Sequence, residues 1–171
     1  MVSASQSTWH LAAAEIDLGI ADQQHISESG VTRAEYLNAV SSFAACLERH
    51  RLRMLNDGWN PVDNRSVDLR FGNVALPDNE VTGYGNDCKK AYLEIVESNF
   101  RSSTTPVMDT KVMSRARECM TAAGIKTTGS ERSLNDLTSG LSQDHIDTVV
   151  QCVTKGAQEI FPGRVIYVRD E

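Results

Sequence analysis

Residues 43–55, FAACLERHRLRML, mark the point where an amphipathic helix gives way to an extended segment. Upstream, Thr32 and Glu35 have the T-x-x-E spacing of a capping box, so we expect the helix to begin there. Apolar residues then recur at helical spacing: Tyr36, Val40, Phe43 and Leu47. From Arg51 onward the apolar residues alternate, and this change of period predicts a strand. Cys46 is therefore expected at the end of a helix that leads directly into a strand.

The extended segment predicts a small antiparallel ribbon over residues 51–71. Asn56-Asp57-Gly58 has the composition of its turn. Alternating apolar residues return after a bend: Val67, Leu69 and Phe71. A second helix, which carries Cys88, follows the break at Pro77 and is expected to end near Ser98.

The second half of the chain repeats this plan. A helical face carries Cys119, and Gly124 is placed to end that helix in the left-handed conformation that glycine adopts without strain. A short extended segment follows at Ile125-Lys126-Thr127-Thr128. Ser142 is a suitable N-cap for a last helix, which carries Cys152. Each half therefore has a cysteine on one helix, an extended segment, and a cysteine on the next helix.

These patterns predict a helix-dominated α+β fold of about five helices with one small antiparallel ribbon. Residues 1–29 are expected to form an N-terminal helix or linker. Residues 30–171 are expected to form one compact domain of two pseudo-repeated helix–strand–helix units, at about 30–100 and 106–160. Residues 165–168, Val-Ile-Tyr-Val, predict a C-terminal strand. We expect it to pair with the ribbon, because an isolated two-stranded hairpin is only marginally stable.

The four cysteines are separated by 41, 30 and 32 residues. None of these gaps has the close spacing of a zinc site or a CxxC redox motif, and four cysteines allow three full pairings. Four free, buried thiols are the alternative. If each half is a self-contained unit, the pairs are Cys46–Cys88 and Cys119–Cys152, whereas crossed pairs would require the halves to interleave. Two such bridges imply an oxidising compartment.

The cysteine segments resemble a known group of proteins. Two segments carry the similarity: ACLERHRLRMLNDGW with YGNDC downstream, and ECMTAAGIKTT with VVQC downstream. They are similar to the "C-[LM]-x-x-x-G, short strands, then Cys on a helix" units of small cell-envelope proteins and lipoproteins of actinobacteria. VTRAEYLNAVSSFAACL resembles their first helix, and the similarity covers about residues 30–160. His50-Arg51 stands where the glycine is expected after the first cysteine.

This resemblance implies export and disulfides, and it implies no activity. We therefore expect an extracellular or cell-surface protein whose signal or anchor segment is absent from the given chain. Contact with a membrane is then expected only through a removed signal or a lipid anchor.

Composition narrows the class of partner. The net charge is −6 and the 17 Lys and Arg residues are scattered, which argues against binding to a phosphate backbone. No apolar segment approaches the roughly 20 residues that span a bilayer. The expected partner is an unknown protein, peptide or cell-wall component, and no nucleic acid.

No catalytic signature is recognisable. The four histidines, His10, His25, His50 and His145, lie in separate segments without metal-ligand spacing. No G-x-S-x-G elbow is present, and Gly83-Tyr84-Gly85 lacks the third glycine of a dinucleotide loop. We therefore expect no catalytic, metal-binding or cofactor-binding residue, and no cofactor.

Trp59, directly after the expected ribbon turn, is the candidate contact residue, because exposed aromatic side chains often anchor partners. The sequence thus favours an exported cell-envelope protein of unknown biochemical role that acts as a non-catalytic binding module. The alternative is a small extracellular hydrolase with an unrecognised acid–base site.

Overall fold

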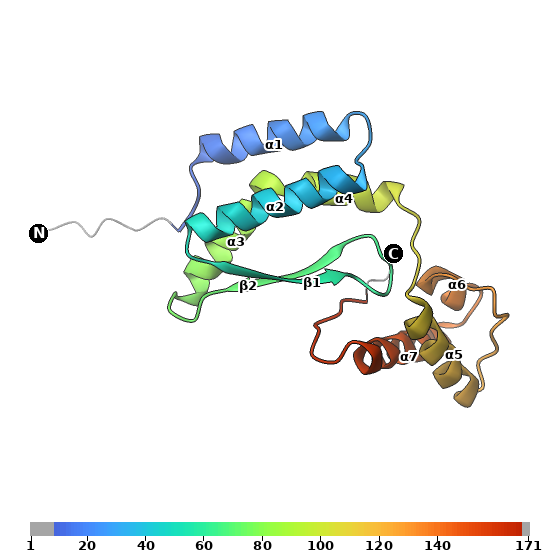
Figure 1. The fold of residues 1–171 in the computed structure, drawn as a ribbon. Coiled ribbons are helices and arrows are strands. Elements are labelled where there is room, and N and C mark those ends of the chain that lie inside the picture. The colour runs from blue at the N-terminus through green and yellow to red at the C-terminus, as the bar shows by residue number, and fades with distance from the viewer. Residues whose placement is uncertain (1–8, 169–171) are drawn as a thin grey trace, which may run out of the picture. The chain divides into compact units, whose positions relative to one another are not determined.

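The computed structural model describes residues 9–168. Within them the chain forms seven α-helices and one two-stranded antiparallel ribbon (Figure 1). In chain order the elements are α1 Ala13–Ser27, α2 Arg33–Arg49, β1 Arg53–Trp59, β2 Val67–Gly72, α3 Asp78–Tyr92, α4 Glu94–Ser103, α5 Thr110–Ala122, α6 Leu134–Thr138 and α7 Gln143–Ile160. The helix-dominated α+β class is confirmed, but the expected count of about five helices is wrong.

The described residues divide into two compact units. The first comprises residues 9–55 and 70–103, and the second comprises residues 56–69 and 104–168. The division runs through the ribbon, so that its open end belongs to the first unit and its closed tip to the second. The sequence placed residues 1–29 outside the compact part, whereas α1 packs against α3 and α4 of the first unit.

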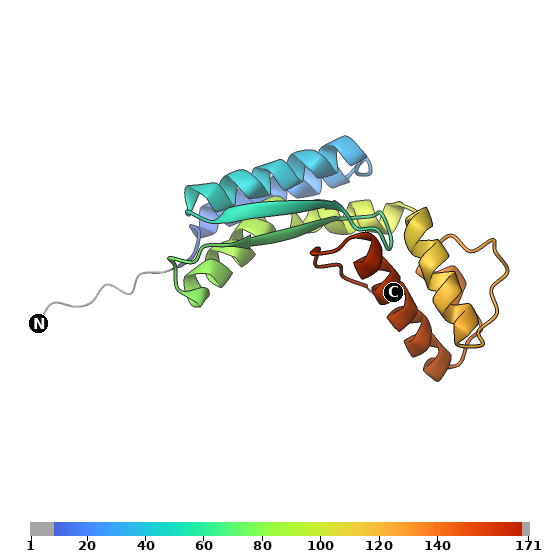
Figure 2. The same ribbon diagram turned by 60° about the horizontal axis from the view of Figure 1, so that its bottom comes forward.

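The first unit is held together by helix packing and a disulfide. α2 packs against α3 and α4, and the end of the ribbon that belongs to this unit contacts α2 where Phe71 meets Phe43 (Figure 1 and Figure 2). The ring of Tyr36 stacks on that of Phe100, with centroids 4.8 Å apart. The Cys46–Cys88 bridge joins α2 to α3, with the Cα atoms 5.7 Å apart. In the chain-entropy model a bridge of this span stabilises the fold by about 4 kcal/mol.

The end of α2 has the same geometry as the end of α5. Arg51 has a left-handed φ of 61°, and the N–H of Leu52 donates to the carbonyl of Leu47 at 2.9 Å. In the second unit Gly124 has a φ of 79°, and the N–H of Ile125 donates to the carbonyl of Met120 at 2.9 Å. Arg51 and Gly124 each lie five residues after the first cysteine of their unit. Both helices thus end in the same capping motif, with arginine in the first and glycine in the second.

The ribbon turn lies further along the chain than expected. Asn56-Asp57-Gly58 forms part of β1, where the side chain of Asn56 accepts a bond from the N–H of Gly58 at 2.8 Å. The chain reverses between Asn60 and Ser66, where the N–H of Asn60 donates to the carbonyl of Ser66 at 2.7 Å. The turn prediction was wrong because the Asx bond of Asn56 is satisfied within the strand.

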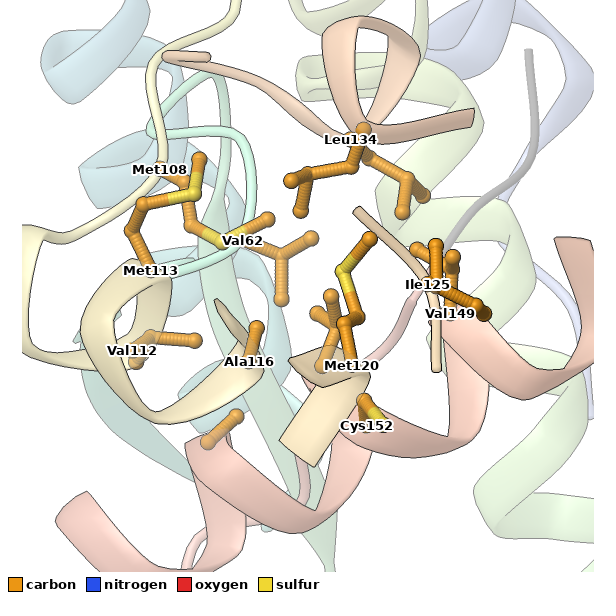
Figure 3. Close-up of a cluster of buried hydrophobic side chains, with 13 residues drawn as sticks. Val62, Met108, Val112, Met113, Ala116, Met120, Ile125, Leu134, Val149 and Cys152 are labelled. Atoms are coloured by element: carbon orange, nitrogen blue, oxygen red, sulfur yellow. The ribbon is translucent and has the colours of Figure 1, made fainter. Parts of the chain in front are cut away.

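The second unit has its own core. Side chains from the ribbon tip, α5, α6 and α7 converge on one cluster, which includes Val62, Met120 and Leu134 (Figure 3). α5 packs along α7, and the Cys119–Cys152 bridge joins them with the Cα atoms 5.5 Å apart. Both disulfide pairs therefore follow the pairing expected from the sequence.

The expected C-terminal strand is absent from the described residues, since residues 165–168 form no strand and the sheet contains β1 and β2 alone. Hydrogen bonds from side chains hold this segment, in place of the backbone hydrogen bonds of a third strand. The guanidinium of Arg164 donates to the carbonyl of Trp59 at 3.0 Å, and the amide of Asn60 donates to the carbonyl of Tyr167 at 3.0 Å. The segment is therefore held against the ribbon tip without adding a third strand.

Candidate functional site

An open groove of about 750 Å³ lies at the open end of the ribbon in the first unit. We call it the apolar groove; its lining includes Arg53, Phe71, Asn73, Val74, Asp78 and Val81. Val74, in the loop after β2, is fully exposed, and Phe71, near the end of β2, is 36% exposed. The groove therefore presents apolar surface that no described residue covers.

Asn73 fixes the loop that forms the wall of the apolar groove. Its side-chain oxygen accepts a bond from the N–H of Ala75 at 2.8 Å, which makes a local Asx turn. Its side-chain amide donates to the carbonyl of Arg51 at 2.6 Å. The loop after β2 is thereby tied to the junction between α2 and β1.

Phe71 anchors the floor of the apolar groove to the core. Its ring meets that of Phe43 edge to face, with centroids 5.9 Å apart. The same ring packs directly against the backbone of Gly85 on α3, where a Cβ atom would overlap it. The position of Phe71 thus depends on a glycine fourteen residues later in the chain.

Two exposed arginines accompany this apolar surface. Neither Arg51 nor Arg53 forms an ion pair with any of residues 9–168. Arg53 lines the groove, and the backbone of Arg51 is bonded to Asn73 in its wall. Asp78 lies in the first turn of α3, where a carboxylate complements the helix dipole. In a chain with net charge −6, this end of the ribbon therefore carries two cations that form no ion pair with the described residues, and one of them, Arg53, lines the groove.

A separate cluster of titratable groups lies where α1, α2 and α3 meet. The carboxylate of Glu15 accepts bonds from the hydroxyl of Tyr92 at 2.7 Å and the guanidinium of Arg49 at 2.6 Å. The Tyr92 bond, followed by Arg49, lowers the pKa of Glu15 despite partial burial. Burial and the Glu15 bond raise the pKa of Tyr92. Glu15 is thus an ionised, paired carboxylate and a poor proton donor near neutral pH.

The structure places the four histidines in four unconnected settings. His10 lies 3.0 Å from a carboxylate oxygen of Asp87, and His25 lies 3.4 Å from Glu28. His50 stacks on the ring of Tyr84, and His145 lies 3.2 Å from the hydroxyl of Ser142. Burial, with Arg49 second, lowers the pKa of His50, which keeps its imidazole neutral at neutral pH.

Trp59 lies at the end of β1, in the second unit, and is half-buried. It does not line the apolar groove. Its role as a partner contact stays a prediction. The apolar groove has no local sequence motif, because Arg53 and Val74 are far apart in the chain. The one signal that points to it is the apolar Val74 in an otherwise turn-forming segment.

The ribbon tip holds a buried polar network in the second unit. Asp68 accepts bonds from Asn60 at 2.9 Å and from Arg164 at 3.1 Å. Burial raises the pKa of Asp68, although both bonds act in the opposite direction. The adjacent pocket, lined by Val62, Asp63 and others, has a volume of about 10 Å³. It holds at most one water molecule, so we assign the network a structural role.

No helix within residues 9–168 is long and apolar enough to cross a bilayer. Comparison of the chain with protein-family models, with curated proteins and with solved structures gave no significant match.

Proposed function

We propose that this protein is exported to the cell envelope and acts there as a non-catalytic binding module. Its two disulfides support an oxidising, extracellular location. The apolar groove is the proposed binding site. Its partner is a protein or peptide segment that carries carboxylates next to an exposed apolar side chain.

The left-handed conformation of Arg51 is the observation that carries this proposal. A non-glycine residue with φ near +60° costs about 1–2 kcal/mol relative to ordinary backbone. The equivalent position of the second unit is Gly124, which has the same geometry without that cost. Strained residues concentrate at functional sites. An exposed, unpaired guanidinium at a position suited to glycine is therefore best explained by a binding role.

The chemistry of the surrounding surface supports the same partner. Arg51 and Arg53 supply positive charge, while Phe71 and Val74 supply apolar contact. Binding to a carboxylate with an adjacent apolar side chain would bury both kinds of surface at once. The aromatic ring of Phe71 is already fixed by the core, so its ordering adds little entropic cost on binding.

The alternative of a small extracellular hydrolase has less support. The convergent acid–base groups are Glu15, Tyr92 and His50, and Glu15 is already paired with Arg49. They line neither the apolar groove nor the small pocket at the ribbon tip. A nucleophile with an adjacent base and an open site would favour this alternative.

Titration with short peptides tests the proposal. The probe is a capped pentapeptide with one Phe between two pairs of Glu, followed by backbone amide shifts in nuclear magnetic resonance spectra. We expect shifts at Arg53, Val74 and Val81 that weaken as salt is added. A peptide with Lys in place of Glu, or Gly in place of Phe, should produce no comparable shifts.

Variants separate binding from folding. Arg51→Gly should weaken peptide binding roughly fivefold, the effect of one partly exposed ion pair. The same variant should raise the free energy of unfolding by about 1 kcal/mol, because glycine relieves the left-handed strain. Arg51→Lys should retain most of the binding. Val74→Ser should abolish it, whereas Val165→Ser, at an exposed valine of the second unit, should not. Unchanged binding in Arg51→Gly and Val74→Ser would show that the groove is not the site.

A further inference from the structure

The two disulfides differ in their access to solvent. Cys46 and Cys88 are both 0% exposed. Cys152 is 2% exposed and Cys119 is half-buried, and both line an open groove of about 190 Å³ between α5 and α7. We infer that Cys119–Cys152 is a site of thiol–disulfide exchange with an external dithiol, and that Cys46–Cys88 is shielded from the same reaction.

The groove over this bridge, which we call the exchange groove, is formed by the close approach of two helices. Gly156 on α7 faces α5, where an added Cβ atom would lie 3.0 Å from the Cβ of Arg115 and 3.3 Å from the carbonyl of Val112. The missing side chain lets the helices approach, and the exchange groove lies beside this contact. A volume of about 190 Å³ corresponds to roughly six water molecules, enough for the end of an incoming thiol.

Two cations and two carboxylates line the exchange groove. The guanidinium of Arg115 is bonded to Glu118 at 2.8 Å and lies 4.0 Å from Glu159. Lys155 also lines the groove and forms no ion pair within the described part of the chain. Its ammonium group is therefore available to stabilise a thiolate, either the incoming one or the one that leaves.

The reaction follows from the relative exposure of the two sulfur atoms. The thiolate of the dithiol attacks Sγ of Cys119, the more exposed partner. The Sγ–Sγ bond breaks and its electron pair leaves on Sγ of Cys152, which becomes a thiolate. The second thiolate of the dithiol then attacks the first sulfur of the dithiol, which is bonded to Sγ of Cys119. That bond breaks, and Cys119 leaves as a thiolate. The dithiol is oxidised to a disulfide, and both cysteines are reduced and take up protons.

The consequence is that α5 and α7 lose their covalent link while α2 and α3 keep theirs. The second unit can therefore be opened under reducing conditions that leave the first unit closed. A dithiol oxidoreductase of an oxidising compartment is the chemical class of partner that would use such a site.

Timed reduction of the full native chain tests this inference. The protein is exposed to dithiothreitol without denaturant, quenched with N-ethylmaleimide at intervals, and mapped by peptide mass spectrometry. Cys119 and Cys152 should be alkylated at least about tenfold faster than Cys46 and Cys88. In urea the two bridges should be reduced at similar rates, since the fold no longer shields either. Equal native rates, or earlier reduction of Cys46–Cys88, would overturn the inference.

Two further measurements test the direction and the electrostatics of the attack. With glutathione as a monothiol, the trapped adduct should lie on Cys119; an adduct mainly on Cys152 would contradict the proposed step. Lys155→Gln should slow reduction by glutathione severalfold, because the anionic thiolate loses a cation in the exchange groove. Lys126→Gln, at an exposed lysine outside the groove, should leave the rate unchanged. If glutathione reduced both variants at the same rate, Lys155 would have no role in stabilising the thiolate.

Discussion

The side-chain oxygen of Gln23 on α1 accepts a hydrogen bond at 2.9 Å from the backbone N–H of Ile95, the second residue of α4. Its side-chain amide donates to the carbonyl of Lys90, in the last turn of α3, also at 2.9 Å. The side chain is 3% exposed. One glutamine therefore satisfies backbone groups at the end of one helix and the start of the next. This explains why α3 and α4 separate at Leu93, where the sequence predicted one continuous helix ending near Ser98.

Replacement of Gln23 should destabilise the first unit. Gln23→Leu keeps the size of the side chain but leaves the N–H of Ile95 and the carbonyl of Lys90 buried without their partner. We expect the free energy of unfolding to fall by about 1–3 kcal/mol, as measured by urea denaturation. Gln24→Leu is the matched control, because Gln24 is the next residue of the same helix and is exposed. Equal losses in both variants would mean that the Gln23 bonds contribute nothing specific.

Gly85→Ala should also destabilise the protein, although alanine is the better helix former by about 1 kcal/mol. The added methyl group would overlap the ring of Phe71 and force it away from α3. We expect a net loss of about 1–3 kcal/mol in thermal or urea unfolding. Gly72→Ala adds a Cβ that meets nothing within 4 Å, and its effect should be small. A stabilised Gly85→Ala protein would show that Phe71 does not pack as described.

The pair of Asp68 and Arg164 predicts a pH-dependent loss of stability. Burial raises the pKa of Asp68, so the folded state binds this proton more tightly than the unfolded state does. The resulting stabilisation is fully present below the unfolded pKa of about 3.9, and it is lost as pH rises through the folded pKa. Arg164→Gln removes a cation and raises that folded pKa further. We expect a loss of about 1–3 kcal/mol at pH 7 and a clearly smaller loss at pH 4.

Arg115→Gln is the control for this measurement. Arg115 pairs with an exposed Glu118, so its loss should be small and similar at both pH values. Urea denaturation at pH 4 and pH 7 supplies the comparison. If Arg164→Gln were equally destabilised at both, the buried Asp68 charge would not be the cause.

Glu131 should have the opposite pH dependence. Burial raises its pKa, but the N–H and hydroxyl of Thr128 and the N–H of Gly129 donate to its carboxylate and hold the pKa at about 2. A depressed pKa stabilises the fold above the unfolded value of about 4.3, and this contribution is lost as pH falls toward 2. Glu131→Gln should therefore lower stability at pH 7 and have little effect near pH 2. Glu118→Gln, at an exposed carboxylate, serves as the control, and a pH-independent loss in Glu131→Gln would contradict the assignment.

Local signals in the sequence predicted several features correctly. The capping box is present, since the N–H of Glu35 donates to the hydroxyl of Thr32 at 3.2 Å and the carboxylate of Glu35 accepts from the N–H of Thr32 at 2.8 Å. Gly124 ends α5 in the left-handed conformation. Ser142 precedes α7 as expected, although its hydroxyl lies near His145 and caps no backbone N–H.

Two local sequence patterns were misread. The Asn-Gly pattern at residues 56–58 is typical of a turn, yet the chain reverses at residues 60–66. Val-Ile-Tyr-Val at residues 165–168 alternates like a strand, but the amide of Asn60 takes the carbonyl of Tyr167. In the first case the side chain of Asn56 bonds the N–H of Gly58 within the strand, and in the second the side chain of Asn60 bonds a carbonyl that the pattern assigned to a β-sheet.

The sequence alone was enough to predict where α2 and α7 begin, where α2 and α5 end and, if each half folds as a unit, which cysteines pair. These features depend on residues within a few turns of one another, or on each half folding as a unit, and periodicity and capping report such local bonds directly. The break between α3 and α4 and the apolar groove became evident only in the folded structure. Both depend on bonds or packing between residues far apart in the chain, such as Gln23 with Ile95 and Asn73 with Arg51. A pattern confined to one segment contains no information about a partner that the fold supplies from another.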